Sequence, residues 1–202
     1  MAWMSSGLIL ASASVARARL LEAAGLAIQI EPAGVDERAI KQAFGADGLP
    51  AHSCALALAE AKARSVAGRR DRSLVIGADQ ILVCGGTWFD KPSDLGEARA
   101  QLEVLRGQTH ELATAACAVR AGRLLWHTVS RPLLTMREFS DGFLDDYIAA
   151  EAAALLGSVG AYRLEGRGAQ LFERIEGDYF AILGLPLLEV LAFLRDCGEI
   201  LS

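Results

Sequence analysis

The chain lacks the cysteine spacing that marks disulfide-rich and zinc-binding proteins. Its four cysteines, Cys54, Cys84, Cys117 and Cys197, lie far apart and form no C-x-x-C pair. Its three histidines form no metal-binding motif either. This pattern favours free thiols in a reducing compartment, so we expect a cytoplasmic protein without structural disulfides or zinc.

An excess of basic charge and a long apolar run are also missing. The net charge is -5, which argues against a nucleic-acid partner because such binding needs cations to displace counterions from phosphates. No segment approaches the uninterrupted apolar length of a membrane-spanning helix, so no membrane partner is expected. The apolar start, residues 1–13, lacks a basic n-region, and the apolar run is short before Arg17 and Arg19, so it is interpreted as a first strand rather than an export signal. With 52% hydrophobic residues, residues 1–202 are expected to form a single domain.

Three well-known catalytic motifs are absent as well. The first turn has no G-x-G-x-x-G, which a dinucleotide-binding dehydrogenase requires. Neither the G-x-x-x-x-G-K-[ST] of a P-loop nucleotidase nor the G-x-S-x-G of a serine hydrolase occurs. Any phosphate chemistry must therefore use another arrangement.

What the chain does contain is an apolar run, Leu74 to Ile76, that stops at Gly77 and then presents Asp79. This reads as a buried strand that ends by delivering an acid to a sheet edge, where open α/β folds bind ligands. The alternative is an Asp that serves a turn or a helix cap. A predicted hairpin at Gly85-Gly86 would fold Lys91 back toward Asp79.

The first predicted strand is followed without a gap by a turn of small residues and a helix. Gly7 to Ala11 forms the strand, Ser12 to Ser14 the turn, and Gly25 ends the helix. Backbone N–H groups at such a helix start, with the Ser14 hydroxyl and the Arg17 guanidinium, would make a phosphate cradle. The alternative is an ordinary serine cap with a solvated arginine.

The remaining elements indicate an α/β fold. A long Ala-rich helix is predicted over residues 51–67, with Lys62 at the border of its apolar stripe. The other predictions are a strand over 27–35 ending at Asp36-Glu37, a helix from Asp94 to Arg106, paired strands over 109–119 and 124–136, a helix capped by Ser140, glycine-rich loops after Leu156, and a last helix over 187–197.

The candidate site residues are hydroxyls, cations and carboxylates that fall at or near the ends of predicted elements. Cations and a helix start suit a polyphosphate, while carboxylates suit a hard metal such as Mg2+ and a general base for water. Hydrolysis of a phosphoanhydride needs all of these groups, whereas a generic nucleotide-binding domain would bind without turnover. The set is Ser14, Arg17, Glu37, Lys62, Asp79, Lys91 and Glu165.

In order along the chain, these residues and their neighbours resemble the Maf family of nucleoside triphosphate pyrophosphatases. The resemblance spans residues 8–186. It is carried by Leu10-Ala11-Ser12-Ala13-Ser14-x-x-Arg17, Val35-Asp36-Glu37, Ala59-x-x-Lys62-Ala63, Ile76-Gly77-Ala78-Asp79, Lys91-Pro92, Leu105-x-Gly107-x-x-His110, Gly160-Ala161-Tyr162, Glu165-Gly166-x-Gly168, Ile175-Glu176-Gly177-Asp178-Tyr179 and Gly184-Leu185-Pro186.

The resemblance implies a mixed twisted sheet with flanking helices that form two lobes around a central cleft, similar to the inosine triphosphatase group. It implies hydrolysis of a nucleoside triphosphate to a monophosphate and pyrophosphate with Mg2+ or Mn2+, clearing modified or surplus nucleotides. Asp79 would activate water and, with Glu37, hold the metal. The triphosphate would contact Ser14, Arg17, Lys62 and Lys91, and Glu165 would lie near the nucleotide. The alternative is a non-catalytic regulator of cell division, and a homodimer is left open.

The chain also departs from the common pattern. It has Ser14-Val15-Ala16-Arg17 where the family often has Ser-Pro-Arg-Arg, so one arginine and the helix-starting proline are missing. Gln80 and residues 171–177 look closer to members acting on 7-methylguanosine triphosphate, whereas Gly160-Ala161-Tyr162 looks like the pyrimidine branch. The preferred base is therefore left open.

Overall fold

A computed structural model describes residues 7–70 and 72–201, and within them one mixed sheet carries eight strands. The strand order is β2-β1-β3-β5-β7-β8, with β4 paired to β3 and β6 paired to β5. Strand β1 runs parallel to β2 and β3, and the other pairs are antiparallel. The bounds are β1 (Leu8–Leu10), β2 (Ile28–Ile30), β3 (Leu74–Cys84), β4 (Thr87–Phe89), β5 (Thr109–Arg120), β6 (Arg123–Ser130), β7 (Leu133–Met136) and β8 (Phe172–Glu176).

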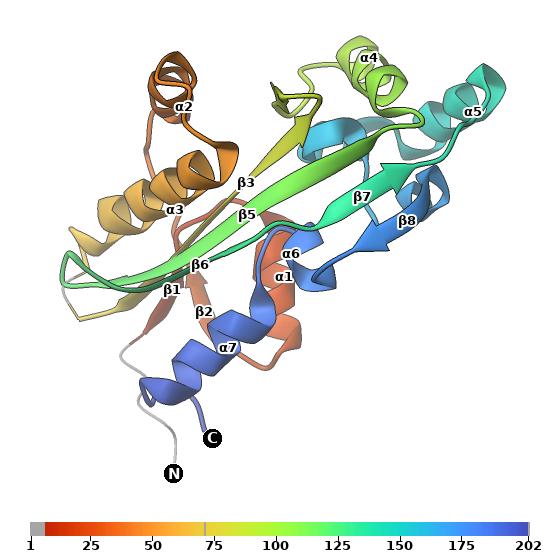
Figure 1. Cartoon of the computed structure of the whole chain (residues 1–202). Helices are drawn as coiled ribbons and strands as arrows, with labels where there is room; N and C mark the ends of the chain where they lie inside the picture. The colour runs from red at the N-terminus through yellow and green to blue at the C-terminus, as the bar shows by residue number, and fades with distance from the viewer. Residues whose placement is uncertain (1–6, 71, 202) are drawn as a thin grey trace.

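Helices flank this sheet on both faces, which confirms the predicted α/β class (Figure 1). Helices α2 and α3 lie on one side, α1 and α7 on the opposite side, and α4 and α5 near the end formed by β7 and β8. The bounds are α1 (Val15–Ala23), α2 (Glu37–Ala46), α3 (Ala51–Ala67), α4 (Leu95–Leu105), α5 (Asp141–Glu151), α6 (Tyr179–Ile182) and α7 (Leu187–Asp196), with 3-10 turns η1 (Ala152–Gly157), η2 (Val159–Ala161) and η3 (Arg167–Leu171).

The helix starts follow the sequence closely. The Ser14 hydroxyl accepts the Arg17 backbone N–H at 3.4 Å, and Asp94 accepts the Glu97 N–H at 2.8 Å. The Ser140 hydroxyl does the same for α5. Each side chain satisfies a backbone donor that the first helical turn leaves without a partner, so three predicted helix starts are confirmed.

The two long central strands, β3 and β5, contribute side chains to each of the three hydrophobic clusters of the core. Alternate residues of a strand face opposite sides of a sheet, and Ala113, Ala115 and Cys117 of β5 accordingly pack under α3. On the other face, Leu112 packs with α4 and α5, whereas Ala116 packs with α1 and α7. Strand β5 therefore contributes to the hydrophobic core on both faces of the sheet.

Several predicted boundaries are wrong, and proline accounts for two of them. The strand predicted over 27–35 covers only Ile28–Ile30, since Pro32 follows and has no N–H for the ladder. The strand predicted over 124–136 is divided at Pro132 into β6 and β7. Glu37 does not follow a strand but begins α2, which Asp36 caps. Strand β8 and helix α6 lie in the segment that was expected to be glycine-rich loop.

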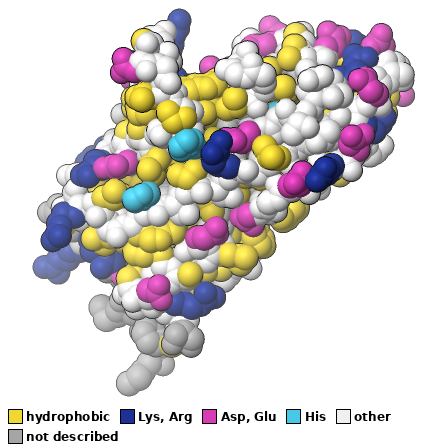
Figure 2. Space-filling model, viewed as in Figure 1, with side chains coloured by type: hydrophobic (Ala, Val, Ile, Leu, Met, Phe, Trp, Pro, Cys, Tyr) yellow, Lys and Arg dark blue, Asp and Glu magenta, His cyan; other side chains and the backbone are white. Residues whose placement is uncertain are grey.

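The remaining composition features have simple structural counterparts. All four cysteines are free thiols, and Cys54, Cys84 and Cys117 are buried. Acidic and basic side chains are interspersed over the face shown in Figure 2. Among the described helices, none combines the length and the apolar character needed to cross a bilayer.

Candidate active site

A cleft of about 540 Å³ opens beside β3, and all seven predicted site residues line it. The cleft exists because β1 accompanies β3 only as far as Ile76, while β4 begins its pairing at Leu82. Between these points the edge of β3 that faces β1 is left open. The structure thus brings together side chains from α1, α2, α3 and β3 with two loops.

Asp79 is not at the end of its strand, as the sequence suggested, but in the middle of β3, which continues to Cys84. The error came from taking Gly77 as a stop. Because neighbouring strand residues face opposite sides, Asp79 faces α3 and Gln80 faces α6, yet both reach the cleft at the open edge. Asp79 does lie at a sheet edge, as predicted, but this edge is the gap between β1 and β4 along β3 and not the end of a strand.

Lys62 joins two carboxylates at the centre of the cleft. Its Nζ lies 2.8 Å from Asp79 Oδ1 and 2.9 Å from Glu37 Oε1. Asp79 and Lys62 are 6% and 7% exposed, whereas the Glu37 side chain, at the start of α2, is 48% exposed. Removing one partner of a buried ion pair is strongly destabilising, because it leaves the other charge buried without compensation.

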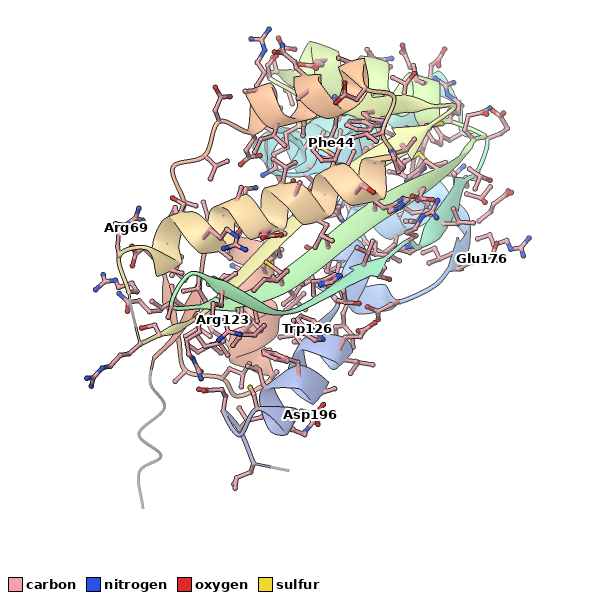
Figure 3. All side chains as sticks on the ribbon, turned by 60° about the vertical axis from the view of Figure 1, so that its left-hand side comes forward. Phe44, Arg69, Arg123, Trp126, Glu176 and Asp196 are labelled. Carbon is pink, nitrogen blue, oxygen red and sulfur yellow. The ribbon has the colours of Figure 1, made fainter. Side chains whose placement is uncertain are left out.

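Gly77 is the reason that α3 can place Lys62 so close to β3. A Cβ at this position would lie 2.1 Å from the Ala59 carbonyl oxygen and 2.9 Å from Ala63 Cβ. Figure 3 shows α3 lying along the sheet, with Phe44 on α2 beyond it. Gly77, which was wrongly taken as the end of the strand, therefore allows the short distance between α3 and β3.

Arg17 is buried and bound by the protein itself. Its Nε donates to the Gly184 carbonyl at 2.7 Å, and its Nη1 donates to the Ala78 carbonyl at 2.9 Å and to the Ser12 hydroxyl at 3.1 Å. The Ala78 carbonyl lies on the open edge of β3, so Arg17 replaces the strand partner missing there. Burial lowers the pKa of Arg17, while Asp79 and Glu37 raise it.

The other three predicted residues lie around the cleft in different settings. Ser14 caps α1 and also lines the cleft, so the two interpretations of this residue are compatible. Lys91 lies at the rim of the cleft and is exposed as a whole residue. Partial burial of its ammonium group lowers its pKa, and the nearby positive charge of Arg17 lowers the pKa further. Glu165 lines the cleft from the loop that follows Tyr162. The predicted return of Lys91 toward Asp79 is confirmed by the β3–β4 hairpin.

Sequence reasoning missed one ion pair of the cleft. Lys41 of α2 pairs with Asp90, which precedes Lys91, and both line the cleft. Helix α2 was not predicted, so nothing indicated that Lys41 lies one turn after Glu37 on the same helix face. The i, i+4 spacing of these two residues was the available signal.

Gln80 was singled out for its identity, but its setting is visible only in the structure. Its Nε2 donates to the Thr114 hydroxyl at 2.8 Å and to the Ala181 and Ile182 carbonyls at 2.9 and 3.2 Å. Carbonyl partners accept only from the amide nitrogen, so the orientation of this amide is fixed.

The carboxylates of Asp79 and Glu37 are the candidate metal ligands of the cleft. Asp79 Oδ2 is buried and finds no hydrogen-bond partner among residues 7–70 and 72–201, a costly state that a cation or a water would relieve. No group of three or more acidic, histidine or cysteine side chains suited to a metal occurs among the described residues. Mg2+ is commonly held by one or two carboxylates together with waters and substrate phosphates. Asp79 and Glu37 fit that mode of binding.

Comparison with known proteins adds to this geometry. The family model described as "Maf-like protein" matches residues 7–197. The chain belongs to the Maf family. That result confirms the resemblance drawn from ten short motifs, and the mixed sheet with its flanking helices agrees with the Maf fold.

Three curated Maf relatives cover nearly the whole chain. A protein of Granulibacter bethesdensis named "Nucleoside triphosphate pyrophosphatase" is 55% identical over 94% of this chain and 96% of its own length. One of the same name from Paramagnetospirillum magneticum is 52% identical over 95% and 99%. A protein of Rhizobium meliloti named "7-methyl-GTP pyrophosphatase" is 50% identical over 96% and 97%.

Proposed function

We propose that the chain hydrolyses nucleoside triphosphates to nucleoside monophosphate and pyrophosphate in the cleft beside β3. The observation that carries this proposal is the buried Asp79, paired through one oxygen with Lys62 and left without a partner at the other. The names of the Maf relatives support it. Removal of modified or surplus nucleotides is the biological role that such an activity would serve.

Asp79 is the group proposed to take the proton from the attacking water. Its carboxylate is held by the Lys62 ammonium at 2.8 Å, which fixes the side chain, while Oδ2 is paired with no group of the described residues. A general base must lie within hydrogen-bond reach of the proton that it removes. A hydrolytic water bound at Oδ2 would meet that condition.

We call the part of the cleft lined by Ser14, Arg17, Lys62, Asp79 and Lys91 the phosphate end. Its cations would bind the triphosphate. Lys91 at the rim is free to approach the outer phosphates, while Arg17 has Nη2 beyond the three contacts described above. The Ser14 hydroxyl at the start of α1 adds a polar group. Such preorganised donors stabilise charge that develops on a departing pyrophosphate.

Asp79 and Glu37 are the residues proposed to hold a divalent metal, Mg2+ or Mn2+. Their carboxylates are brought together by the same Lys62 Nζ. When bound, such an ion would neutralise phosphate charge and lower the pKa of a coordinated water. The cations of the protein would then act on the more distant phosphates.

Residues 157–165 line the cleft together with Leu112 and Ile182. We call this part of the lining the nucleoside end, and it supplies most of the large apolar side chains of the cleft. It is lined by Leu112, Val159, Tyr162, Leu164 and Ile182, with Glu165 beside them. Apolar walls with a few polar groups suit a sugar and a base. The nitrogen of the Gln80 amide is held by Thr114 and two carbonyls, so its oxygen is the atom that would accept from a base. The Rhizobium meliloti relative makes 7-methyl-GTP a necessary member of any substrate panel.

The decisive experiment follows products rather than substrate loss. Purified protein is incubated with natural triphosphates and 7-methyl-GTP in oxygen-18 water, with Mg2+ or Mn2+ present. Attack at the α phosphorus gives pyrophosphate and a monophosphate that carries the label, and EDTA stops the reaction. Nucleoside diphosphate and inorganic phosphate as first products would contradict the proposal.

Asp79→Asn is the matched control for the same experiment. It should retain nucleotide binding in the absence of turnover, because an asparagine cannot act as the base. If the wild-type protein binds triphosphates without releasing pyrophosphate under any condition of the panel, the chain is instead a nucleotide-binding regulator.

A further inference from the structure

The wall of the nucleoside end contains a strained turn. Gly160 and Ala161 both have left-handed backbone angles, with φ of 75° and 55°. Such a conformation costs a non-glycine residue about 1–3 kcal/mol and persists only where the surroundings impose it. The flanking residues on both sides, Ser158 and Arg163 among them, line the cleft. The shape of this wall therefore depends on whatever holds the turn.

Tyr162 directly follows the turn and packs closely against it. Its side chain is almost fully buried, and a Cβ at Gly160 would lie only 2.8 Å from its Cε1. The Tyr162 hydroxyl lies 2.8 Å from His110 Nε2. Phe172 packs edge-on against the Tyr162 ring, with centroids 4.9 Å apart. The Tyr147 hydroxyl adds a long hydrogen bond, 3.4 Å, to the Ala161 carbonyl.

His110 lies behind this wall on β5 and is 1% exposed. Its Nδ1 is buried, and no partner for it is found in the described part of the chain. The donor in the His110–Tyr162 hydrogen bond depends on which ring nitrogen of His110 carries the proton. With either direction, this is the one hydrogen bond between the His110 ring and the described part of the chain, so it fixes the ring relative to Tyr162.

We propose that His110 is a positioning residue for nucleotide binding: through its hydrogen bond to Tyr162 it holds the Gly160-Ala161 turn in the shape that receives the nucleoside. This inference rests on the proposed function, because it concerns the same cleft. His110 touches no reacting atom in this account, so its loss should weaken binding and leave the chemical step, which belongs to Asp79, largely unchanged.

The test compares KM and kcat for five proteins. In His110→Phe and Tyr162→Phe, KM should rise about tenfold, the effect of one hydrogen bond, with kcat within about twofold of wild type. The double variant should raise KM by about the same factor as either single change, because both remove one interaction. His110→Gln, which places an amide nitrogen within similar reach of the Tyr162 hydroxyl, should recover most of the affinity.

A control variant separates positioning from general loss of stability. Leu194→Ala removes a fully buried side chain of α7 from a different core, so it should lower the unfolding temperature and leave KM unchanged. An unchanged KM in both single variants, multiplied effects in the double variant, or an equal rise of KM in Leu194→Ala would each overturn the proposal.

A binding measurement keeps this test independent of turnover. The dissociation constant of a non-hydrolysable nucleoside triphosphate is measured for the same variants by calorimetry and should change in parallel with KM. If the wild-type protein shows no pyrophosphate release, the proposed function fails while this second readout still decides the role of His110. Equal dissociation constants for wild type, His110→Phe and Tyr162→Phe would refute it.

Discussion

At the phosphate end of the cleft the important side chains come from α3 and β3, whose backbones touch at Gly77, whereas the nucleoside end is walled by 3-10 turns with left-handed residues. The first end is fixed by regular hydrogen bonding and the second by individual side chains such as Tyr162. In the proposed function, the chemistry that all triphosphates share would take place on the first of these parts. Recognition that differs between bases would fall on the part that few contacts determine, where substitutions can alter shape without disturbing the proposed catalytic groups.

The largest effect is expected from removing the acid of the phosphate end. Asp79→Asn should lower kcat by about a hundredfold or more, because the amide cannot accept the proton of water. Asp90→Asn is the matched control, since it changes an exposed carboxylate of the same cleft and should have only a small effect. Pyrophosphate release and thermal unfolding of both variants are measured. Activity close to wild type in Asp79→Asn would remove this residue from the mechanism.

The contact between α3 and β3 is tested by Gly77→Ala. The new Cβ would collide with the Ala59 carbonyl oxygen at 2.1 Å, so the free energy of unfolding should fall by about 3 kcal/mol as helix and strand are forced apart. Gly45→Ala on α2, where nothing lies within 4 Å of the added atom, should be neutral or stabilise by up to about 1 kcal/mol. Urea unfolding compares them, and similar stabilities would show that the close approach is not required.

Arg17 and Lys91 carry the same charge at the phosphate end but differ in their partners. Both Arg17→Ala and Lys91→Ala should lower kcat/KM, by about ten- to a hundredfold. Only Arg17→Ala should also destabilise the protein, by about 1–3 kcal/mol, since the Ala78 and Gly184 carbonyls would lose their donor. Steady-state kinetics and denaturant unfolding are measured together. Equal stability of the two variants would contradict the structural role of Arg17.

Protonation of His110, behind the nucleoside end, should make the free energy of unfolding fall at acidic pH. Burial lowers the pKa of His110 from 6.5 to about 4, so the unfolded chain binds a proton at a pH where the folded protein does not. This contribution to stability is full above pH 6.5 and is lost as the pH falls toward 4, a loss of about 2 kcal/mol by pH 5. His110→Gln should lose less stability than wild type between pH 7 and pH 5. The same loss in both proteins would show that His110 does not contribute.

The phosphate end was largely predictable from the sequence because its signals are local. The small residues of α3, the serine cap of α1 and the hairpin at Gly85-Gly86 each follow from a short pattern, and all seven candidate residues reach one cleft. Their roles stay predictions. The open edge of β3 could not be foreseen, since it depends on where β1 stops beside it. Asp79 was placed at the end of a strand because Gly77 was taken as its stop, whereas β3 continues to Cys84.

The nucleoside end was not predictable, because its structure depends on contacts between distant residues. His110 and Tyr162 are 52 positions apart, and neither residue type reveals its partner. Strand β8 reads as loop because its residues are mostly exposed and it pairs only with β7. Helix α2 buries none of its residues fully, so its weak burial pattern concealed both the helix and the Lys41–Asp90 pair.

The continuous pairing of β3 with β5 has a consequence for the kinetics of binding. Nine residue pairs join these strands from Val75 to Val83, and the two strands run beneath both ends of the cleft. Rotation of one half of the molecule against the other would have to bend this paired ribbon. We therefore expect a cleft that is already formed before the nucleotide arrives, so that stopped-flow binding traces should show a single concentration-dependent phase without a slower closing step.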